Sequence, residues 1–290
     1  MMRKFKRSFS TPLAIGLIVA VILGMFVTIG LPLPRSQAQT IGQTIGQTQL
    51  HWYGQSAYKL TTPTGGVLLI DPWLENPLNK TAKADLASLN KVDLILITHG
   101  HFDHVGNAID IAKKTGAKLV STYDLAQALI HHAGYPKEQA GFDTLGNFGG
   151  ELTLLNGQVK VAFIPAVHSS SVASDGSPAA YAGNPGGFLI TVKNGPVIYH
   201  TGDTDLFGDM SLIPQFRKVT LMLACIGDQF TMGPLRAAEA VKLVNPDRVI
   251  PMHYGVFSLT GTPEAFSQAL KQGKLKTKLT VMQVGETLKL

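Results

Sequence analysis

The chain has 290 residues, of which 45% are hydrophobic and only 15% are charged, a composition that excludes an intrinsically disordered protein. Its formal net charge of +6 comes almost entirely from five basic residues before residue 39: Arg3, Lys4, Lys6, Arg7 and Arg35. The rest of the chain carries 20 basic and 19 acidic residues, and this near-neutral balance argues against a nucleic-acid partner.

Residues 1–38 have the organisation of an export signal. Four basic residues precede an uncharged apolar stretch of 19 residues, Leu13–Leu31, and the small-residue site Ser36-Gln37-Ala38 follows. Since such a stretch is long enough to span a bilayer, a cleaved signal peptide and a retained membrane anchor both stay open. In either case the basic flank keeps the N-terminus in the cytoplasm. We therefore expect the following domain to be exported, either periplasmic or anchored to the outer face of the cytoplasmic membrane, with no other membrane contact.

Residues 39–48 are polar and contain Thr-Ile-Gly-Gln twice in tandem, which is typical of a flexible linker. Residues 49–290 show no internal boundary and are expected to form a single domain. Strands are predicted where apolar or alternating residues lie between turn residues. They are Leu50–Gly54, Ala57–Thr61, Val67–Ile70, Asp93–Thr98, Leu152–Leu155, Gln158–Pro165, Gly187–Lys193, Val197–His200, Val219–Ala224, Asp247–Pro251 and Leu279–Val284.

Four helices are predicted between these strands, at Val105–Thr115, Asp124–Ala133, Pro234–Val244 and Pro263–Gln272. Many strands with interspersed helices favour two packed sheets with helices outside. Periodicity alone leaves a doubly wound sheet as the alternative.

Residues 98–104 read Thr-His-Gly-His-Phe-Asp-His and begin where a predicted buried strand ends. Neutral imidazole and carboxylate are suitable ligands for zinc and similar divalent ions. One ion cannot use three imidazoles and a carboxylate from so short a loop, so the spacing favours two adjacent ions. The alternative, Asp103 capping a helix beside surface histidines, is disfavoured because the chain has only nine histidines.

Three further candidate ligands, His168, Asp203 and His253, each lie just after a predicted strand. Loops at one rim of a rigid scaffold can converge on a common point. Each residue also has an ordinary interpretation when taken alone. Asp203 lies between Gly202 and Thr204 and could close a turn through its own side chain, and a single histidine is often a hydrogen-bonded structural residue.

Together these residues resemble the metallo-β-lactamase superfamily, whose signature is His-x-His-x-Asp-His. The resemblance covers essentially all of residues 49–290 and is strongest to a branch of uncharacterised metal-dependent hydrolases similar to ascorbate-6-phosphate lactonase. It implies an α/β fold, an αββα sandwich of two mixed β-sheets flanked by helices. The matching segments are Trp52-Tyr53-Gly54-Gln55-Ser56, Ile70-Asp71-Pro72-Trp73, His99–His104, Ala166-Val167-His168-Ser169-Ser170, Tyr199–Thr204, Phe230–Pro234 and Ile250–Gly255.

The resemblance also implies two groups of metal ligands joined by one bridging carboxylate. The first ion would be held by His99, His101 and His168, the second by Asp103, His104 and His253, and both by Asp203. Zinc is the expected metal, with manganese or iron as alternatives.

Two such ions can share a water, lower its pKa and present hydroxide to an ester, lactone or phosphodiester bond of a small-molecule substrate. Asp103 is the candidate to accept the proton of this water. His200 and Tyr254 are candidates to stabilise the developing oxyanion. His200, three residues before Asp203, could instead orient that carboxylate.

Two alternatives to this activity stay open: a β-lactamase-like amide hydrolase, and a non-catalytic metal-binding protein of the same fold. The first is disfavoured because the β-lactamases of the superfamily have no bridging carboxylate, and because the only thiol, Cys225, follows an apolar run typical of packing. The second would be expected to have lost ligands. Gln55 departs from relatives, which commonly carry His near the site rim, and Asp71 is interpreted as orienting a ligand or forming a turn.

Overall fold

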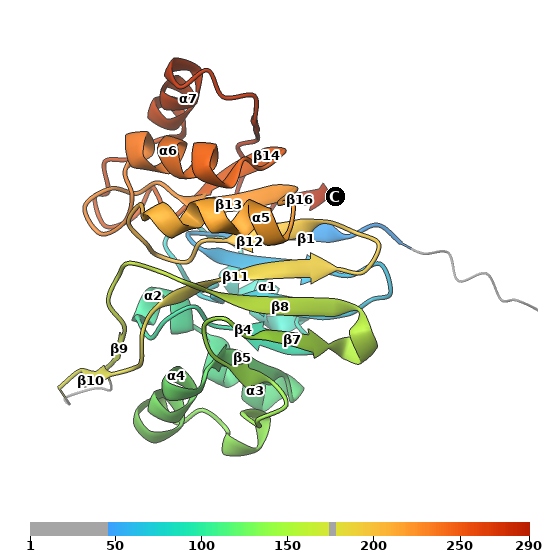
Figure 1. The fold of residues 1–290 in the computed structure, drawn as a ribbon. Helices are drawn as coiled ribbons and strands as arrows, with labels where there is room; N and C mark the ends of the chain where they lie inside the picture. The colour runs from blue at the N-terminus through green and yellow to red at the C-terminus, as the bar shows by residue number, and fades with distance from the viewer. Residues whose placement is uncertain (1–45, 174–177) are drawn as a thin grey trace, which may run out of the picture. The chain divides into compact units, whose positions relative to one another are not determined.

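The computed structural model describes residues 46–173 and 178–290. The predicted signal peptide or membrane anchor and most of the predicted linker lie outside the described residues. Within them, two seven-stranded sheets pack against each other, and helices cover their outer faces (Figure 1). This arrangement confirms the αββα sandwich and excludes the doubly wound single sheet. Among the described residues, no helix is both long and apolar enough to cross a membrane.

The first sheet has the strand order β16-β1-β2-β3-β4-β5-β6 and is mixed. The strands from β16 to β3 pair antiparallel, whereas β3, β4, β5 and β6 pair in parallel. The strands are β1 (Gln49–Gly54), β2 (Ala57–Thr61), β3 (Val67–Ile70), β4 (Leu94–Leu96), β5 (Lys118–Thr122), β6 (Leu145–Gly146) and β16 (Thr287–Lys289).

The second sheet has the order β15-β14-β13-β12-β11-β8-β7 and is also mixed. It is antiparallel from β7 to β12 and parallel from β12 to β15. Its strands are β7 (Glu151–Leu154), β8 (Val159–Pro165), β11 (Gly186–Val192), β12 (Val197–His200), β13 (Leu221–Cys225), β14 (Arg248–Met252) and β15 (Lys278–Leu279). A short pair, β9 (Ser171–Val172) and β10 (Ala180–Tyr181), lies in the loop after β8.

The two helical layers lie at opposite ends of the view in Figure 1. Apolar residues of α3 and α4 pack on one face of the first sheet, and those of α6 and α7 belong to the core of the second. The helices are α1 (Ala82–Ser88), α2 (Phe102–Val105), α3 (Ala108–Thr115), α4 (Tyr123–Ala128), α5 (Ile213–Phe216), α6 (Pro234–Val244) and α7 (Pro263–Gln272). Shorter helical turns are η1 (Leu129–Ala133), η2 (Lys137–Gln139), η3 (Leu155–Gly157) and η4 (Gly208–Leu212).

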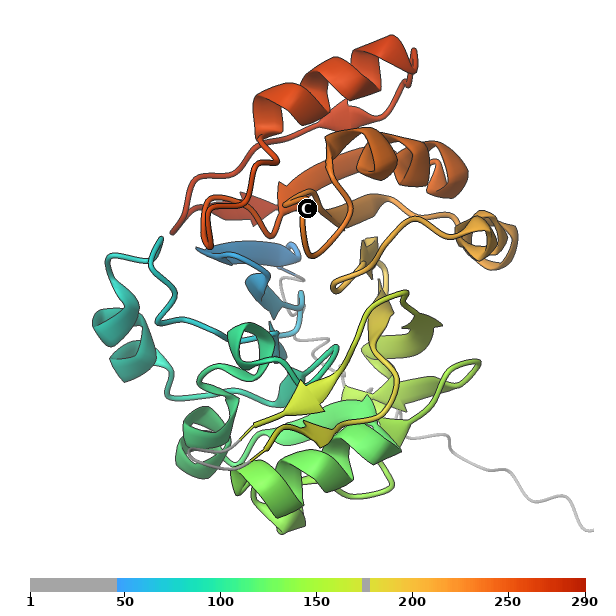
Figure 2. The same ribbon diagram turned by 90° about the vertical axis from the view of Figure 1, so that its left-hand side faces the viewer.

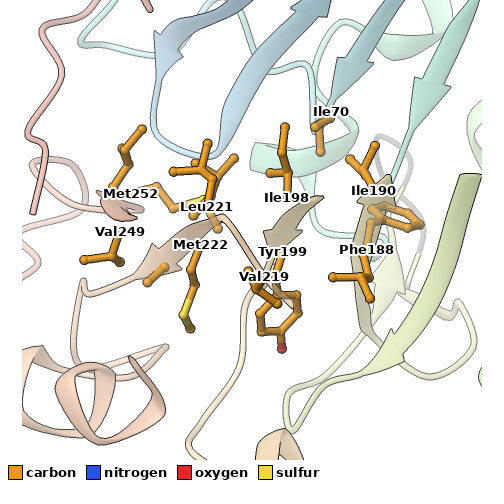
Figure 3. Close-up of a cluster of buried hydrophobic side chains, with 14 of the residues drawn as sticks. Ile70, Phe188, Ile190, Ile198, Tyr199, Val219, Leu221, Met222, Val249 and Met252 are labelled. Atoms are coloured by element: carbon orange, nitrogen blue, oxygen red, sulfur yellow. The ribbon is translucent and has the colours of Figure 1, made fainter. Parts of the chain in front are cut away.

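The central strands of the second sheet carry apolar side chains on both faces, and one of these faces forms the core between the two sheets. Ile198 and Leu221 point toward the first sheet, where Ile70 lies, whereas Tyr199 and Met222 point to the opposite face (Figure 3). Because successive side chains of a strand alternate between faces, such uniformly apolar strands can only be central. The central strands therefore form a rigid frame whose ends hold the loops of the site.

Strands β5, β6, β9 and β10 were not predicted, and the predicted helix Asp124–Ala133 is α4 followed by the π-helical turn η1. Two other predicted elements differ more in the structure. The predicted helix Val105–Thr115 is divided into α2 and α3 at Gly106, where φ is +41°. A Cβ atom there would lie 2.4 Å from Trp73 Cα, so only glycine permits this close approach. The predicted strand Leu279–Val284 is strand only at its first residue, in β15, and the chain instead returns to the first sheet as β16.

Candidate metal centre

The seven predicted ligands lie in α2 and in loops that follow strand ends. Figure 2 shows the sandwich from the side on which α2 lies in Figure 1. His99 and His101 follow β4, and α2 then carries Asp103 and His104. The other three follow strands of the second sheet: His168 comes after β8, Asp203 after β12 and His253 after β14. The structure brings all seven together as two neighbouring groups.

The first group consists of His99, His101 and His168, whose ligand atoms lie within 4.8 Å of one another. The Nδ1 atom of His101 is 2.9 Å from His99 Nε2 and 3.3 Å from His168 Nε2. Burial lowers the pKa of His99 well below its usual range and also lowers those of His101 and His168. These imidazoles are therefore neutral, which is the form that binds metal.

The second group consists of Asp103, His104, Asp203 and His253, which are all buried. Asp203 Oδ2 lies 2.9 Å from His253 Nε2 and 3.3 Å from His104 Nε2. The same oxygen is 3.7 Å from His168 Nε2 in the first group. One carboxylate oxygen thus lies between the two groups, in the position that a bridging ligand requires.

Several buried polar atoms of the second group have no hydrogen-bond partner within the described part of the chain. They are His104 Nε2, Asp203 Oδ1 and both ring nitrogens of His253. A buried polar atom without a partner costs about 1–3 kcal/mol, so proteins rarely leave several in one place. A divalent cation would satisfy His104 Nε2, Asp203 Oδ1 and one ring nitrogen of His253, and the donor set of imidazole and carboxylate fits such an ion.

The charges of the second group are coupled. Burial disfavours the charged form of His253, but Asp203 and Asp103 outweigh it and raise the pKa to about 9. His104 behaves similarly, and three carboxylates raise its pKa well above the usual value. In return, these imidazoles hold the pKa of buried Asp203 well below its usual value and that of Asp103 at about 2. Both carboxylates are therefore ionised, and His104 and His253 must lose protons when they bind a metal.

Asp71 orients the ligands from behind, as one of its two predicted roles suggested. Its Oδ2 accepts hydrogen bonds from His104 Nδ1 at 2.8 Å and from Thr98 Oγ1 at 2.7 Å. The Thr98 hydroxyl in turn lies 3.0 Å from His99 Nδ1. With Nδ1 of each imidazole used in this way, Nε2 of His104 and His99 points into the centre, and the ring orientation is held in advance.

The backbone at the strand ends is strained where it carries these side chains. Asp71 and His253 are buried non-glycine residues with φ of +45° and +56°. This left-handed conformation costs roughly 1–2 kcal/mol for a residue with a Cβ, and such strain collects at functional sites. Gly202, directly before Asp203, has φ of +61°, and a Cβ there would lie 2.4 Å from Gly186 O. No other residue type fits at that position.

The structure does not bring His200 or Tyr254 to the cavity beside the ligands. His200 is fully buried, with Nε2 3.2 Å from the Ser56 carbonyl and Nδ1 accepting from the Gly202 N–H at 3.2 Å. Both ring nitrogens are occupied, so this geometry favours positioning of the loop before Asp203 over contact with an oxyanion. The Tyr254 ring packs on Trp52 at a centroid distance of 5.7 Å, and burial raises its pKa to about 12.

Gln55 lies behind the site instead of at its rim. It is buried with φ of +51°, and its Nε2 donates to Asp103 Oδ2 at 3.3 Å. Its backbone carbonyl oxygen accepts from the Trp52 indole at 3.1 Å and from the His253 backbone N–H at 3.3 Å. From the sequence, Gln55 was noted to depart from relatives at this position. The hydrogen bond between Gln55 and Asp103 could not be predicted, because the two residues are 48 positions apart in the chain.

A cavity of about 620 Å³ opens beside the two groups. Five ligands line it, namely His101, Asp103, His168, Asp203 and His253. A separate apolar groove of about 790 Å³, between β8 and α5, contains none of them. The ligand-lined cavity is therefore where a substrate can meet the metal centre.

Comparison with known proteins agrees with this geometry. The family model described as a Beta-lactamase superfamily domain matches residues 67–254. A UPF0173 metal-dependent hydrolase from Thermodesulfovibrio yellowstonii is 58% identical over 85% of this chain and 94% of the relative. One from an Anaeromyxobacter species is 52% identical over 83% of this chain and 86% of the relative. The solved structure of Igni18, a metallo hydrolase from the archaeon Ignicoccus hospitalis, is 35% identical with a TM-score of 0.72, covering 84% of this chain and 98% of that one.

The family match extends over most of the domain and includes all seven predicted ligands. The most similar relatives named above are described as metal-dependent hydrolases and share more than half of their aligned residues with this chain. The chain therefore belongs to the Beta-lactamase superfamily domain family, and within it to the UPF0173 metal-dependent hydrolases.

Proposed function

We propose that the two ligand groups bind two divalent ions, most suitably zinc, and that the protein hydrolyses an ester, lactone or phosphodiester bond of a small molecule. The observation that carries this proposal is the position of Asp203 Oδ2, within 3.7 Å of imidazole nitrogens from both groups. A shared carboxylate of this kind holds two ions close together. When bound, the ions lower the pKa of water at the site and polarise the oxygen of the bond under attack.

The chain's own residues supply the remaining steps. Asp103 lines the cavity as an ionised carboxylate and is the group that accepts the proton of the attacking water. Gln55 holds one oxygen of this carboxylate through its amide N–H. Asp71 and Thr98 keep the histidine rings aligned, so that no reorganisation is needed when substrate arrives.

Several features argue against β-lactamase activity. The Asp203 carboxylate, placed between the two groups, would add negative charge there and make bound ions weaker Lewis acids. Cys225 is fully buried in the hydrophobic core, and its Sγ donates to the Thr204 carbonyl at 3.6 Å. Burial raises the pKa of this thiol to about 11, so it is not placed or ionised as a metal ligand.

The metal-loaded protein is expected to hydrolyse at least one member of a panel of esters, lactones and phosphodiesters, and to lose this activity after chelation. Penicillins and carbapenems should give kcat/KM well below the usual enzymatic range of about 10⁴ M⁻¹s⁻¹ or more. Metal content is measured in the same samples and separates zinc from manganese and iron. Full metal occupancy with no hydrolysis of any compound would instead indicate a non-catalytic metal-binding protein, and efficient β-lactam turnover alone would indicate an amide hydrolase.

We also propose that the domain functions outside the cytoplasmic membrane, on the basis of the basic flank and apolar stretch in residues 1–38. A reporter that is active only outside the cytoplasm, fused after residue 60, is expected to be active. The matched control is the same fusion starting at residue 39, which should be silent. An inactive full-length fusion with an active cytoplasmic counterpart would contradict export, and the N-terminal sequence of the mature protein distinguishes cleavage from anchoring.

A further inference from the structure

The cavity beside the metal centre has a lining that divides into two parts. Five of its residues are metal ligands. The other five contact whatever part of a substrate extends away from the reacting bond, and they are Phe102, Ser169, Gln229, Phe230 and Phe257. This second set is therefore expected to decide which substrates fit.

Three aromatic rings pack together beside the cavity, and two of them, Phe102 and Phe257, line it. Trp73 stacks on Phe257 with a centroid distance of 5.7 Å and an interplanar angle of 2°. Phe102 meets both rings edge-on, at 5.6 Å from Trp73 and 5.8 Å from Phe257. Rings that pack on one another in this way hold their positions, so the wall is preformed. We call these three residues the aromatic wall.

The three phenylalanine side chains that line the cavity are exposed although they are large and apolar. Phe102 is 67% exposed, Phe230 53% and Phe257 41%. A cluster of exposed aromatic residues beside a cavity is typical of a surface that an apolar ligand covers. Phe230 lies in the segment between β13 and α6, so the apolar lining comes from several separate parts of the chain.

Charged groups are missing from the part of the lining that is not metal-ligating. Within residues 46–173 and 178–290, no lysine or arginine lines this cavity, and its two polar non-ligand residues, Ser169 and Gln229, are uncharged. Proteins normally recognise a phosphate or carboxylate group with arginine, lysine or clustered backbone N–H groups. A substrate with an anionic group away from the reacting bond would place that charge against phenylalanine rings.

We propose that the substrate is an uncharged ester or lactone whose acyl portion is an alkyl chain or an aromatic group that packs on the aromatic wall and Phe230. This proposal rests on the hydrolytic function proposed above and specifies its substrate class. In the reaction, the oxygen of water bonds to the acyl carbon and the acyl carbon–oxygen bond breaks. One proton of the water passes by way of Asp103 to the leaving oxygen, which gives an alcohol and a carboxylic acid.

The test compares two substrates that differ only in a distal charge: 4-nitrophenyl hexanoate and the 4-nitrophenyl monoester of adipic acid. We expect kcat/KM to be at least about tenfold higher for the hexanoate. We also expect kcat/KM for 4-nitrophenyl hexanoate to be about tenfold higher than for 4-nitrophenyl acetate. One methylene group in a closed apolar pocket changes kcat/KM by about tenfold or more. Because the aromatic wall is partly open to solvent, we expect a smaller effect for each methylene group here.

Three variants connect these preferences to the lining. Phe257→Ala and Phe230→Ala should each remove most of the difference between hexanoate and acetate while retaining the metal content of the wild type. Gln229→Lys should raise kcat/KM for the adipate monoester relative to the hexanoate. Phe142→Ala is the matched control, because Phe142 is 83% exposed and stacks on Tyr123 outside the cavity. It should leave both preferences unchanged.

The proposed function and this proposal fail in different ways. Hydrolysis of none of the esters, lactones and phosphodiesters by the metal-loaded protein would overturn both. Equal or better hydrolysis of the adipate monoester, or hydrolysis of phosphodiesters alone, would overturn only the substrate class. If the phenylalanine variants kept the chain-length preference but lost binding to phosphatidylglycerol vesicles, the exposed rings would serve a membrane surface and the proposal would also be overturned.

Discussion

Asp103→Asn is expected to lower kcat by about 10² to 10⁴-fold at full metal occupancy, because the amide cannot accept a proton. The carboxylate lies in the right place for this role, since it lines the cavity and its Oδ2 is 3.4 Å from His253 Nε2. Asparagine has nearly the same shape and can still meet the amide of Gln55, which donates to Oδ2 at 3.3 Å. KM should therefore change much less than kcat.

Asp103 is also a predicted metal ligand, so the rate must be divided by the measured metal content of each preparation. Asp110→Asn is the matched control, because Asp110 is exposed on α3 and belongs to neither ligand group. Its kcat should equal that of the wild type. An unchanged kcat in Asp103→Asn with both ions bound would show that another group accepts the proton.

Most of the longer strands could be predicted from the sequence because they are apolar runs between turn residues. β5 was missed although it lies within the first sheet, and β6, β9 and β10 have only two residues each. β16 could not be predicted, because it is short and its residues Thr287 and Lys289 are exposed and polar. It is a strand only because β1 offers a free edge in the folded protein, where Leu288 pairs with Leu50. The break between α2 and α3 depends in the same way on Trp73, a residue distant in sequence from Gly106.

The clustering of the seven candidate ligands could be predicted because the spacing of His99, His101, Asp103 and His104 is local and because the ends of neighbouring strands lie close together. The roles of His200 and Tyr254 could not, because they depend on which side of a strand end each ring occupies after packing. The packing of the aromatic wall could not be predicted either, because its three residues come from two loops and a helix and share no sequence motif. Functional residues that are close together in the sequence can thus be predicted from their spacing. Functional residues that depend on tertiary contacts cannot.

The two ligand groups should lose their ions separately when one group is damaged. The wild type is expected to bind about two divalent ions per chain, one for each group. His101→Ala removes the nitrogen that lies closest to both His99 and His168, so the ion of the first group should be lost preferentially. His253→Ala removes the nitrogen 2.9 Å from Asp203 Oδ2 and should empty the second group instead.

Metal analysis and thermal unfolding of the same samples test this prediction. A free metal concentration of 1,000 times the Kd of a site stabilises the folded state by about 4 kcal/mol. Each variant should retain about one ion and lose part of the increase in Tm that metal gives to the wild type. His131→Ala is the control, since His131 is exposed in η1 and outside both groups. Loss of both ions from both variants would mean that the groups act as one cooperative site. A wild type that binds no ion under metal-replete conditions would remove the basis of the proposed hydrolysis, because the unpartnered nitrogens of His104 and His253 would then need another explanation.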